Sequence, residues 1–467
     1  MTRHPARAAV PSAQLAAEKF FSALERFLHV EAVSGIVLLL AAGSALLWAN
    51  SPAGHSYHSL WELPLTFSLG PFSISQSLHF IVNDALMSVF FLVVGMEIRR
   101  EIYQGSLAHL RVAALPLAAA LGGIVVPAII YTTLSANSEL RQGWAVPTAT
   151  DIAFAVGVLA LLGKAIPLSV RVLLLALAII DDIAAVIIIA VFFAQGFDPS
   201  GLLLAFTAVL LVFAMQSLGI GNAFAYILPG ALLWFGMLKT GVHPSLTGVV
   251  LGLLTPTMAR RMRRPAVEIA NKALLDLHGQ IEARPNQPQQ LAHPLRTLRE
   301  AQRELLPPVV RVQMALHPWV AFGVMPLFAL ANAGVALDEI DLGSSTTQGV
   351  AMSVALALVL GKPLGIVLGS WAAVRIGWCQ LPDGVTWRGV MLVGILGGIG
   401  FTMSIFIATL AFSNAGLLSA AKFGVLLGSL IAAVAGLLFG FYSFTKPGQS
   451  KTTVEIHGKL SQEGDAS

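Results

Sequence analysis

Long uncharged runs of apolar residues alternate with short polar segments along most of the chain. Many of these runs are about 20 residues long, and a helix of that length can cross roughly 30 Å of hydrocarbon. Twelve membrane-spanning helices are predicted, at about residues 32–50, 78–97, 112–135, 143–163, 170–194, 201–217, 222–238, 241–257, 318–337, 348–374, 388–411 and 416–444. The pattern therefore predicts an all-α polytopic membrane protein, with its transmembrane domain at residues 32–444.

The segments at the two ends of the chain are polar. Residues 1–31 form a lead in which apolar side chains recur near helical spacing at 10–31, so an interfacial amphipathic helix is expected there. Because no small-residue cleavage site follows the run at 32–50, this run is expected to be a span and not a cleaved signal peptide. A cytoplasmic tail is expected at 445–467.

Two loops between the spans have distinctive compositions. In the outer loop at 51–77, apolar and polar residues alternate around a Gly-Pro pair, which predicts a short β-hairpin at 65–75. The segment at 258–316 is polar and rich in Gln, Pro and Arg. A long cytoplasmic loop with some helix is expected there, and it would act as a tether between the spans on either side.

The composition and charge of the chain agree with a membrane location. Of 467 residues, 56% are hydrophobic and only 11% are charged, too few to build the surface of a soluble protein. The formal net charge of +4 would suit nucleic acid binding, but the positions of the 28 Lys and Arg residues explain it better. With both termini inside, 24 of them fall in inner segments and two in outer loops, which is the bias of a membrane protein. No nucleic acid partner is expected.

Four ionisable side chains lie deep within the predicted spans, namely Asp151, Asp181, Asp182 and Lys362. Each costs roughly 2.5–3.5 kcal/mol at a helix centre, so they must face the protein interior or a water-filled cavity. A buried ion pair that merely locks helices together is one explanation. One lysine cannot neutralise three carboxylates, however, so negative charge remains for a mobile cation.

The adjacent aspartates Asp181 and Asp182 suggest a specific chemistry. Neighbours on a helix point about 100° apart, so one can face a cavity while the other faces a packed partner. Burial and a neighbouring like charge both disfavour an ionised carboxylate, which brings its titration toward neutral pH. Such a group can hold a proton or Na⁺ but not both at once. The two carboxyl groups would titrate as a pair.

Two of the predicted spans contain helix-breaking residues. Pro147 interrupts the span that holds Thr150 and Asp151, and four glycines lie within residues 394–400. Glycine-rich spans can also be explained by close helix packing. The interruptions occupy matching places in spans three to five and ten to twelve, which indicates an inverted repeat with a site at the midplane. Asp151 and Lys362 are suitable counter-charges for the helix ends exposed there.

Seven motifs make the chain resemble the NhaA family of sodium/proton antiporters. They occur in order at residues 90–101, 149–157, 181–182, 239–243, 317–319, 361–365 and 400–404. The similarity extends from about Ser34 to Tyr442, apart from residues 260–308. The resemblance implies the NhaA-type fold, with inverted repeats in spans three to five and ten to twelve and with spans four and eleven discontinuous.

The resemblance also implies roles for the buried polar residues. Asp182, with Asp181 and Thr150, would form the Na⁺ and Li⁺ site. Asp181 would pair with Lys362 in the inward-facing, protonated state. Asp151 and Lys362 would balance the helix ends where spans four and eleven cross.

The implied activity is that of a secondary active transporter and not an enzyme. The family exports Na⁺ by alternating access in electrogenic exchange for two H⁺, and it serves pH and sodium homeostasis in the bacterial inner membrane. The transported ions would be Na⁺, Li⁺ and H⁺. No cofactor is implied, and the single cysteine, Cys379, offers no metal-ligand cluster. The expected partners are membrane lipid and a second copy of the chain, which would be bound through the hairpin at 65–75.

Some residues match positions that the family uses to respond to pH. Glu97 and Glu101 match a charge cluster at the cytoplasmic mouth, and His243 matches a histidine on the other side. Taken alone, the sequence favours a simpler explanation of Glu97 and Glu101, as a solvated helix end paired with arginines. Gln313 and Met314 replace titratable residues of the best-known members, so the pH threshold of those members is not expected to apply.

Three other functions fit the sequence less well. A sodium-coupled organic-anion symporter needs Na⁺ sites without proton competition, which adjacent aspartates do not favour. An intramembrane aspartyl protease could use Asp151 and Asp181, but the Tyr-Asp pair and Gly-x-Gly-Asp run of those proteases do not surround them. In an ion channel, Lys362 would block a continuous cation path.

Overall fold

The computed structural model describes most of the expected transmembrane domain. Placement is described for residues 33–444 except 70–71, 106–107, 109, 136, 195, 197, 259–265, 284–292, 299–305 and 337–343. The helix expected at 10–31 and the tail expected at 445–467 lie outside the described residues.

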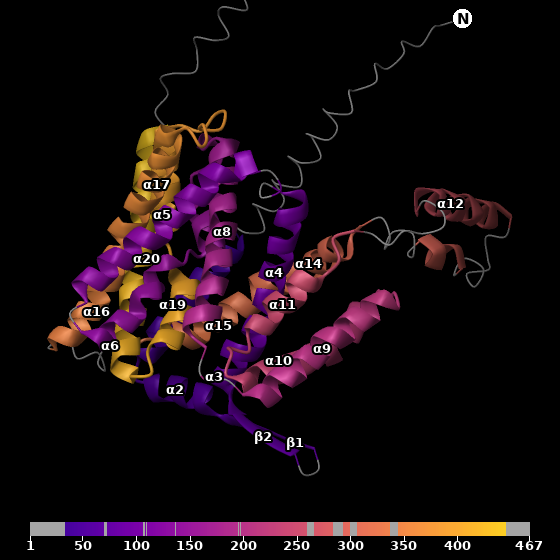
Figure 1. Ribbon diagram of the computed structural model, residues 1–467, viewed down its shortest axis with the longest axis horizontal. Helices are drawn as coiled ribbons and strands as arrows, with labels where there is room; N and C mark the ends of the chain where they lie inside the picture. Colours follow the sequence, from indigo (N-terminus) through magenta and orange to yellow (C-terminus); the bar gives the residue numbers. More distant parts are fainter. Residues whose placement is uncertain are drawn as a thin grey trace, which may run out of the picture.

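Helices make up nearly all of the described structure (Figure 1). After a first helix at Val33–Ala49, the α-helices are Gly54–Glu62 (α2), Leu78–Phe80 (α3), Met87–Gln104 (α4), Leu110–Leu134 (α5), Ser138–Arg141 (α6), Ile152–Leu161 (α7), Leu168–Phe192 (α8), Pro199–Ser217 (α9), Ile227–Thr240 (α10), Leu246–Leu254 (α11), Ala266–Ala283 (α12), Pro308–Trp319 (α14), Met325–Asn332 (α15), Ser345–Leu356 (α16), Lys362–Ile376 (α17), Trp387–Gly397 (α18), Phe401–Ala411 (α19) and Ala415–Phe444 (α20). Short π-helical segments occur at Ile81–Leu86 (η1), Val320–Val324 (η6) and Ala357–Gly361 (η8), and a 3₁₀ segment at Gln142–Thr148 (η3).

The prediction of an all-α polytopic membrane protein is confirmed. Among the described residues, eight helices are long and apolar enough to cross a membrane, and three bent pairs raise the number to eleven. The span expected at 241–257 is represented by α11, which has only nine residues because a turn with left-handed Gly241 precedes it. The span expected from residue 318 begins at Pro308, so the long loop is shorter than expected at its C-terminal end.

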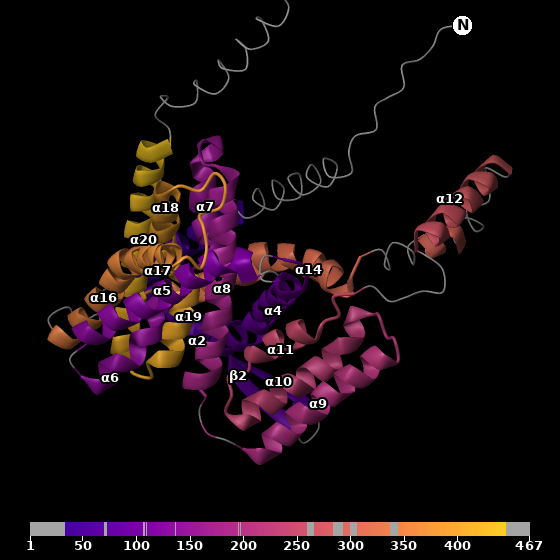
Figure 2. The same cartoon turned by 45° about the horizontal axis from the view of Figure 1, so that its top comes forward.

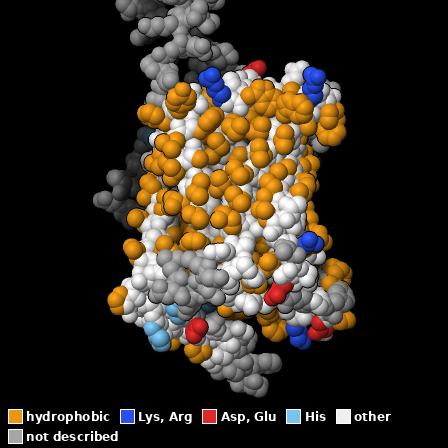
Figure 3. Space-filling view, turned by 90° about the vertical axis from the view of Figure 1, so that its left-hand side faces the viewer, with side chains coloured by type: hydrophobic (Ala, Val, Ile, Leu, Met, Phe, Trp, Pro, Cys, Tyr) orange, Lys and Arg blue, Asp and Glu red, His pale blue; other side chains and the backbone are white. Residues whose placement is uncertain are grey.

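The surface of the molecule has the polarity of a membrane protein. In Figure 3, hydrophobic side chains cover a broad band of the visible face, and charged side chains lie at its two ends. Large apolar side chains are also exposed on other helices, such as Leu203 on α9, Leu228 on α10 and Leu438 on α20. Such a band matches the hydrocarbon of a bilayer, where exposed apolar side chains are stable.

The helices form two groups that pack mainly within themselves. One group contains α5, α17, α18 and the pair α16 and α20, and the other contains α4, α11, α14 and the pair α9 and α10. Figures 1 and 2 show α9 and α10 on the side of the molecule opposite to α16 and α20. The long helix α8 lies between them and contacts α5 and α18 as well as α4.

Both predicted interruptions are present, and they meet. Ser138–Thr148 and α7 are bent by 50° at a break of three residues, and α18 and α19 are bent by 46°. The backbone N–H of Asp151 donates a hydrogen bond of 2.7 Å to the carbonyl of Ile399, which joins the two breaks. Backbone groups freed from a helix inside a membrane need such internal partners.

One contact in the first group is made directly between backbones. A Cβ atom built on Gly365 of α17 would lie 2.1 Å from the carbonyl oxygen of Gly122 on α5. A Cβ on Gly122 would lie 2.0 Å from the carbonyl oxygen of Gly365. Only glycine permits this approach, and close packing of small residues is a main source of helix association in membranes. The contact fixes the helix that begins at Lys362.

A two-stranded antiparallel sheet lies within the outer loop. Its strands are Pro64–Leu69 (β1) and Phe72–Ser77 (β2), with Pro64 opposite Ser77 and Leu69 opposite Phe72. In Figure 1 these strands project beyond α2 and α3 at the lower end of the bundle. The distribution of basic residues along the sequence leads us to expect this end on the outer side of the membrane.

The variant Gly365→Ala is expected to lower the melting temperature of the purified protein, because its new Cβ would collide with the backbone of α5. Gly349→Ala on α16 is the matched control, since nothing lies within 4 Å of the added atom. Alanine favours a helix over glycine by about 1 kcal/mol, so the control should keep or raise the melting temperature. Equal melting temperatures in the two variants would contradict a backbone contact between α5 and α17.

Candidate functional site

Asp151 lies where the two interrupted spans cross. It is 1% exposed, and one carboxylate oxygen accepts a hydrogen bond of 3.0 Å from the backbone N–H of Phe154 in α7. The other oxygen accepts from the backbone N–H of Thr402 in α19 at 3.1 Å, and from the Thr402 hydroxyl. The N-terminus of a helix carries a partial positive charge of about half a unit. One buried carboxylate therefore caps the N-termini of both α7 and α19.

A buried ion pair lies beside this crossing. The Nζ of Lys362 is 2.6 Å from Oδ2 of Asp181, and their side chains are 0% and 1% exposed. Lys362 is the first residue of α17 and directly follows the π-helical segment η8. Insertions of this kind are common at functional sites, where they reorient side chains. Asp181 lies in the middle of α8, on the helix that borders both groups.

Thr150 connects the ion pair to the second interrupted span. Its hydroxyl accepts a hydrogen bond of 2.9 Å from Lys362 Nζ. It lies 2.7 Å from Oδ2 of Asp181 and 2.9 Å from the carbonyl oxygen of Gly397, the last residue of α18. A hydroxyl has one hydrogen, so Thr150 donates to only one of these two acceptors at a time. Lys362 thus reaches the C-terminal end of α18 through Thr150.

Asp182 differs from its neighbour in its partners. It is 3% exposed, and the ion pair of Lys362 is formed with Asp181. Oδ1 of Asp182 and Oδ1 of Asp181 are both buried and make no hydrogen bond among the described residues. Buried oxygens of this kind require an explanation, because almost all buried polar atoms have a partner. Carboxylate and hydroxyl oxygens are the ligands that hard cations take, so Asp181, Asp182 and Thr150 form a suitable donor set.

The structure does not bring the residues considered for pH response into one place. Glu97 on α4 is close enough to act electrostatically on Asp182, and Glu101 lies one turn further along the same helix. His243 lies in the turn between α10 and α11, toward the hairpin end. Of the two departures from the family pattern, Gln313 is buried and Met314 is 64% exposed.

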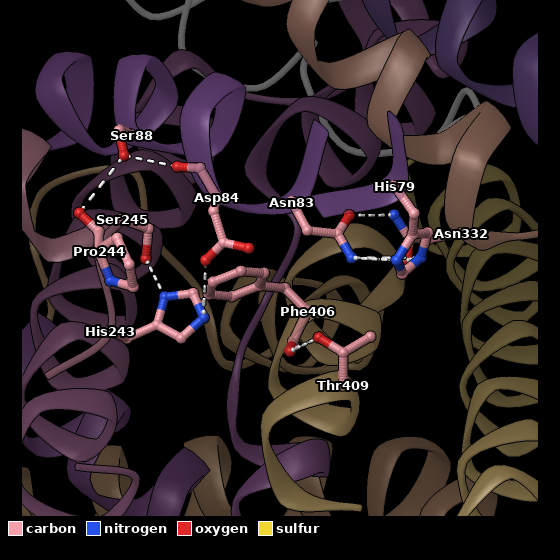
Figure 4. A network of polar contacts seen from close by, with 10 residues as sticks. All are labelled: His79, Asn83, Asp84, Ser88, His243, Pro244, Ser245, Asn332, Phe406 and Thr409. Atoms are coloured by element: carbon pink, nitrogen blue, oxygen red, sulfur yellow. Dashed lines mark hydrogen bonds and ion pairs between the residues drawn. The ribbon is translucent and has the colours of Figure 1, made fainter. Parts of the chain in front are cut away.

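The immediate partner of His243 is a residue that the sequence analysis missed. Nε2 of His243 lies 3.4 Å from Oδ1 of Asp84 in η1, and Nδ1 lies 2.7 Å from the hydroxyl oxygen of Ser245 (Figure 4). Asp84 lies within the run at 78–97, where a buried carboxylate is as exceptional as the four residues singled out above. An acidic residue inside an apolar run was the available signal.

The variant Lys362→Met is expected to destabilise the protein by about 3–5 kcal/mol, because it leaves the carboxylate of Asp181 buried without its counter-charge. The double variant Asp181→Asn/Lys362→Met removes both charges and should recover most of the melting temperature. Lys239→Met at the exposed end of α10 is the control and should change little. A double variant no more stable than Lys362→Met would show that the pair does not account for the loss.

The chain was compared with protein families and with curated proteins. The model of the family described as "Na+/H+ antiporter 1" matches residues 25–439. A "Na(+)/H(+) antiporter NhaA" of Cupriavidus necator is 66% identical over 435 residues, which are 93% of this chain and 93% of the relative. Proteins of the same name from Janthinobacterium sp. and Bordetella petrii are 63% and 60% identical, over 93% and 94% of this chain and over 96% and 95% of their own lengths. The chain therefore belongs to the Na⁺/H⁺ antiporter 1 family, the family of NhaA.

Proposed function

We propose that the chain is an electrogenic sodium and lithium/proton antiporter that exports Na⁺ in exchange for H⁺. The observation that carries the proposal is the unequal treatment of two adjacent buried carboxylates. Lys362 neutralises Asp181, whereas the equally buried Asp182 has no such ion pair among the described residues. A site with more acid than base needs a mobile cation, and both Na⁺ and H⁺ can fill that role.

The exchange follows from competition for the same oxygens. Na⁺ would bind Asp182, Asp181 and Thr150, and it would displace Lys362 from Asp181. Protons would return when Na⁺ leaves, one on the carboxyl group of Asp182 and one through the Lys362 and Asp181 pair. The two protons exchanged for one Na⁺ move a net charge in each cycle, so a potential of 100 mV contributes about 2.3 kcal/mol per cycle.

Alternating access would come from movement of the interrupted helices relative to the rest of the protein. Asp151 supports this role, because it keeps the N-termini of α7 and α19 compensated without water. The arrangement in two helix groups supports a movement of one group against the other. We place the protein in the bacterial inner membrane with both termini in the cytoplasm, as the basic residues favour. Glu97, Glu101 and His243 would adjust the activity to pH.

We also propose that two copies, each surrounded by membrane lipid, associate through the periplasmic hairpin of β1 and β2. The hairpin projects from the helices, and Leu65 is 45% exposed. Its outer edges can accept the strand of a second copy, since an unpaired strand edge offers free backbone groups.

In inverted membrane vesicles with an acid interior, addition of Na⁺ or Li⁺, but not K⁺, should raise the internal pH. Asp181→Asn and Asp182→Asn should each reduce this exchange to background, because each removes a charge for which the ions compete. Asp383→Asn in an exposed loop is the matched control and should retain normal exchange. The measurement is the recovery of the fluorescence of a pH-sensitive dye. Normal exchange in Asp182→Asn would exclude Asp182 from the ion site.

Binding of Na⁺ to the purified protein should weaken as the pH falls. Where the carboxyl groups are protonated, each proton that Na⁺ must displace raises the apparent Kd about tenfold per pH unit. Titration calorimetry over a pH series measures this slope and also the protons released. A Kd that stays constant with pH would contradict shared occupancy of one site and would favour a sodium-coupled symporter.

A further inference from the structure

Phe406 connects the interrupted helix α19 to α4, to α15 and to the turn before α11. Its side chain is 1% exposed and contacts three rings that we call the aromatic cage, namely those of Phe91, Phe328 and His243. The ring centroids of Phe91 and His243 lie 5.5 Å and 5.4 Å from that of Phe406, and the centroid of Phe328 lies at 6.1 Å. These are the distances of packed aromatic pairs.

The cage lies on the outer side of the candidate ion site. The half-helix α19 begins at the crossing, where Thr402 binds Asp151, and it runs toward the end that carries the hairpin. Phe406 is four residues beyond Thr402, which corresponds to about 6 Å along a helix. Because residues four apart share a helix face, Phe406 lies on the same face of α19 as Thr402, on the outer side of the crossing.

The members of the cage come from separate elements outside the crossing. Phe91 is on α4, Phe328 is on α15, and His243 is in the turn before α11. The imidazole of His243 is held from both ring nitrogens, by Asp84 on one side and Ser245 on the other (Figure 4). The figure shows the Phe406 ring lying against this imidazole. The aromatic cage therefore holds the ring of Phe406, which belongs to α19, the helix that also contacts Asp151.

We propose that Phe406 is the outer gate residue of the ion path; this inference rests on the proposed antiport. The Phe406 ring, packed against these three rings, leaves an apolar plug that excludes water, which is how hydrophobic constrictions gate ion pathways. The path opens outward when α19 moves and carries Phe406 out of the cage formed by Phe91, Phe328 and His243. The same half-helix then links the binding site to its outer barrier.

Accessibility to a thiol reagent tests the gate without relying on transport. Met403 is buried one turn inward of Phe406, so Met403→Cys in a Cys379→Ser background is the reporter. A charged, membrane-impermeant methanethiosulfonate is added to the outer side of right-side-out vesicles, and the rate of modification is measured. Phe406→Ala should raise this rate at least tenfold. Phe91→Ala, which opens the cage from the other side, should raise it in the same direction.

The controls separate an open gate from a disturbed fold. Phe412→Ala removes another buried ring just beyond the same half-helix, where it packs against Gly143, and should change outer labelling less than twofold. Labelling from the inner face of inverted vesicles should be unchanged in all variants. If neither Phe406→Ala nor Phe91→Ala changed the rate of thiol modification from the outer side, the gate would be overturned. It would also be overturned if Phe412→Ala raised this rate equally, or if modification from the inner face rose by the same factor. If the chain without substitutions showed no Na⁺/H⁺ exchange, the antiport would be refuted, but the labelling rates would still report whether Phe406 closes the outer side.

Discussion

The crossing of two interrupted helices at Asp151 is the arrangement on which the rest of the molecule depends. Inside a bilayer a broken helix leaves polar backbone groups that water cannot reach, and each such group costs several kcal/mol. Here the carboxylate of Asp151 accepts N–H groups from both α7 and α19, and its own N–H bonds to Ile399. The breaks are therefore stable, and they place helix ends and non-helical backbone at the centre of the protein.

This crossing makes room for a site in which acid exceeds base. Asp181 and Lys362 neutralise each other, while Asp182 has no counter-charge in an ion pair among the described residues. Removing one member of a buried pair is more damaging than removing both, because an isolated charge in a low-dielectric interior is very unfavourable. The same physics supports the proposal that the remaining carboxylate binds a small cation. In that proposal, stability and ion binding at this site depend on the same few charges.

Much of the fold could be predicted from the sequence because a bilayer imposes a simple length rule. Uncharged runs located the spans, and Pro147 together with the glycines at 394–400 located the two breaks. Charges within apolar runs identified Asp151, Asp181, Asp182 and Lys362. The fold pairs Lys362 with Asp181 and places Thr150, the neighbour of Asp151, against both. Spacing alone could not choose which aspartate Lys362 contacts, since neighbouring residues differ only in direction around α8.

Other features depended on packing that local patterns do not record. The helix that begins at Pro308 was assigned partly to a loop, because Arg311 and Gln313 make its first turns polar. Asp84 was overlooked, although it too interrupts an apolar run, and its contact with His243 joins segments about 160 residues apart. The π-helical segments η1, η6 and η8 have no clear mark in the sequence, since they differ from an α-helix by a single inserted residue.

The single hydrogen of the Thr150 hydroxyl has a consequence for ion selectivity. While Lys362 donates to this oxygen, the hydrogen can point to either Asp181 or the Gly397 carbonyl. A metal ion in place of the ammonium group needs a lone pair from the Thr150 oxygen. The hydroxyl can present this lone pair by rotating so that its hydrogen points to the Gly397 carbonyl. Valine at this position would have the same shape but neither the lone pair nor the rotation. In the proposed antiport, the hydroxyl would let the same site coordinate a metal ion and an ammonium group in turn.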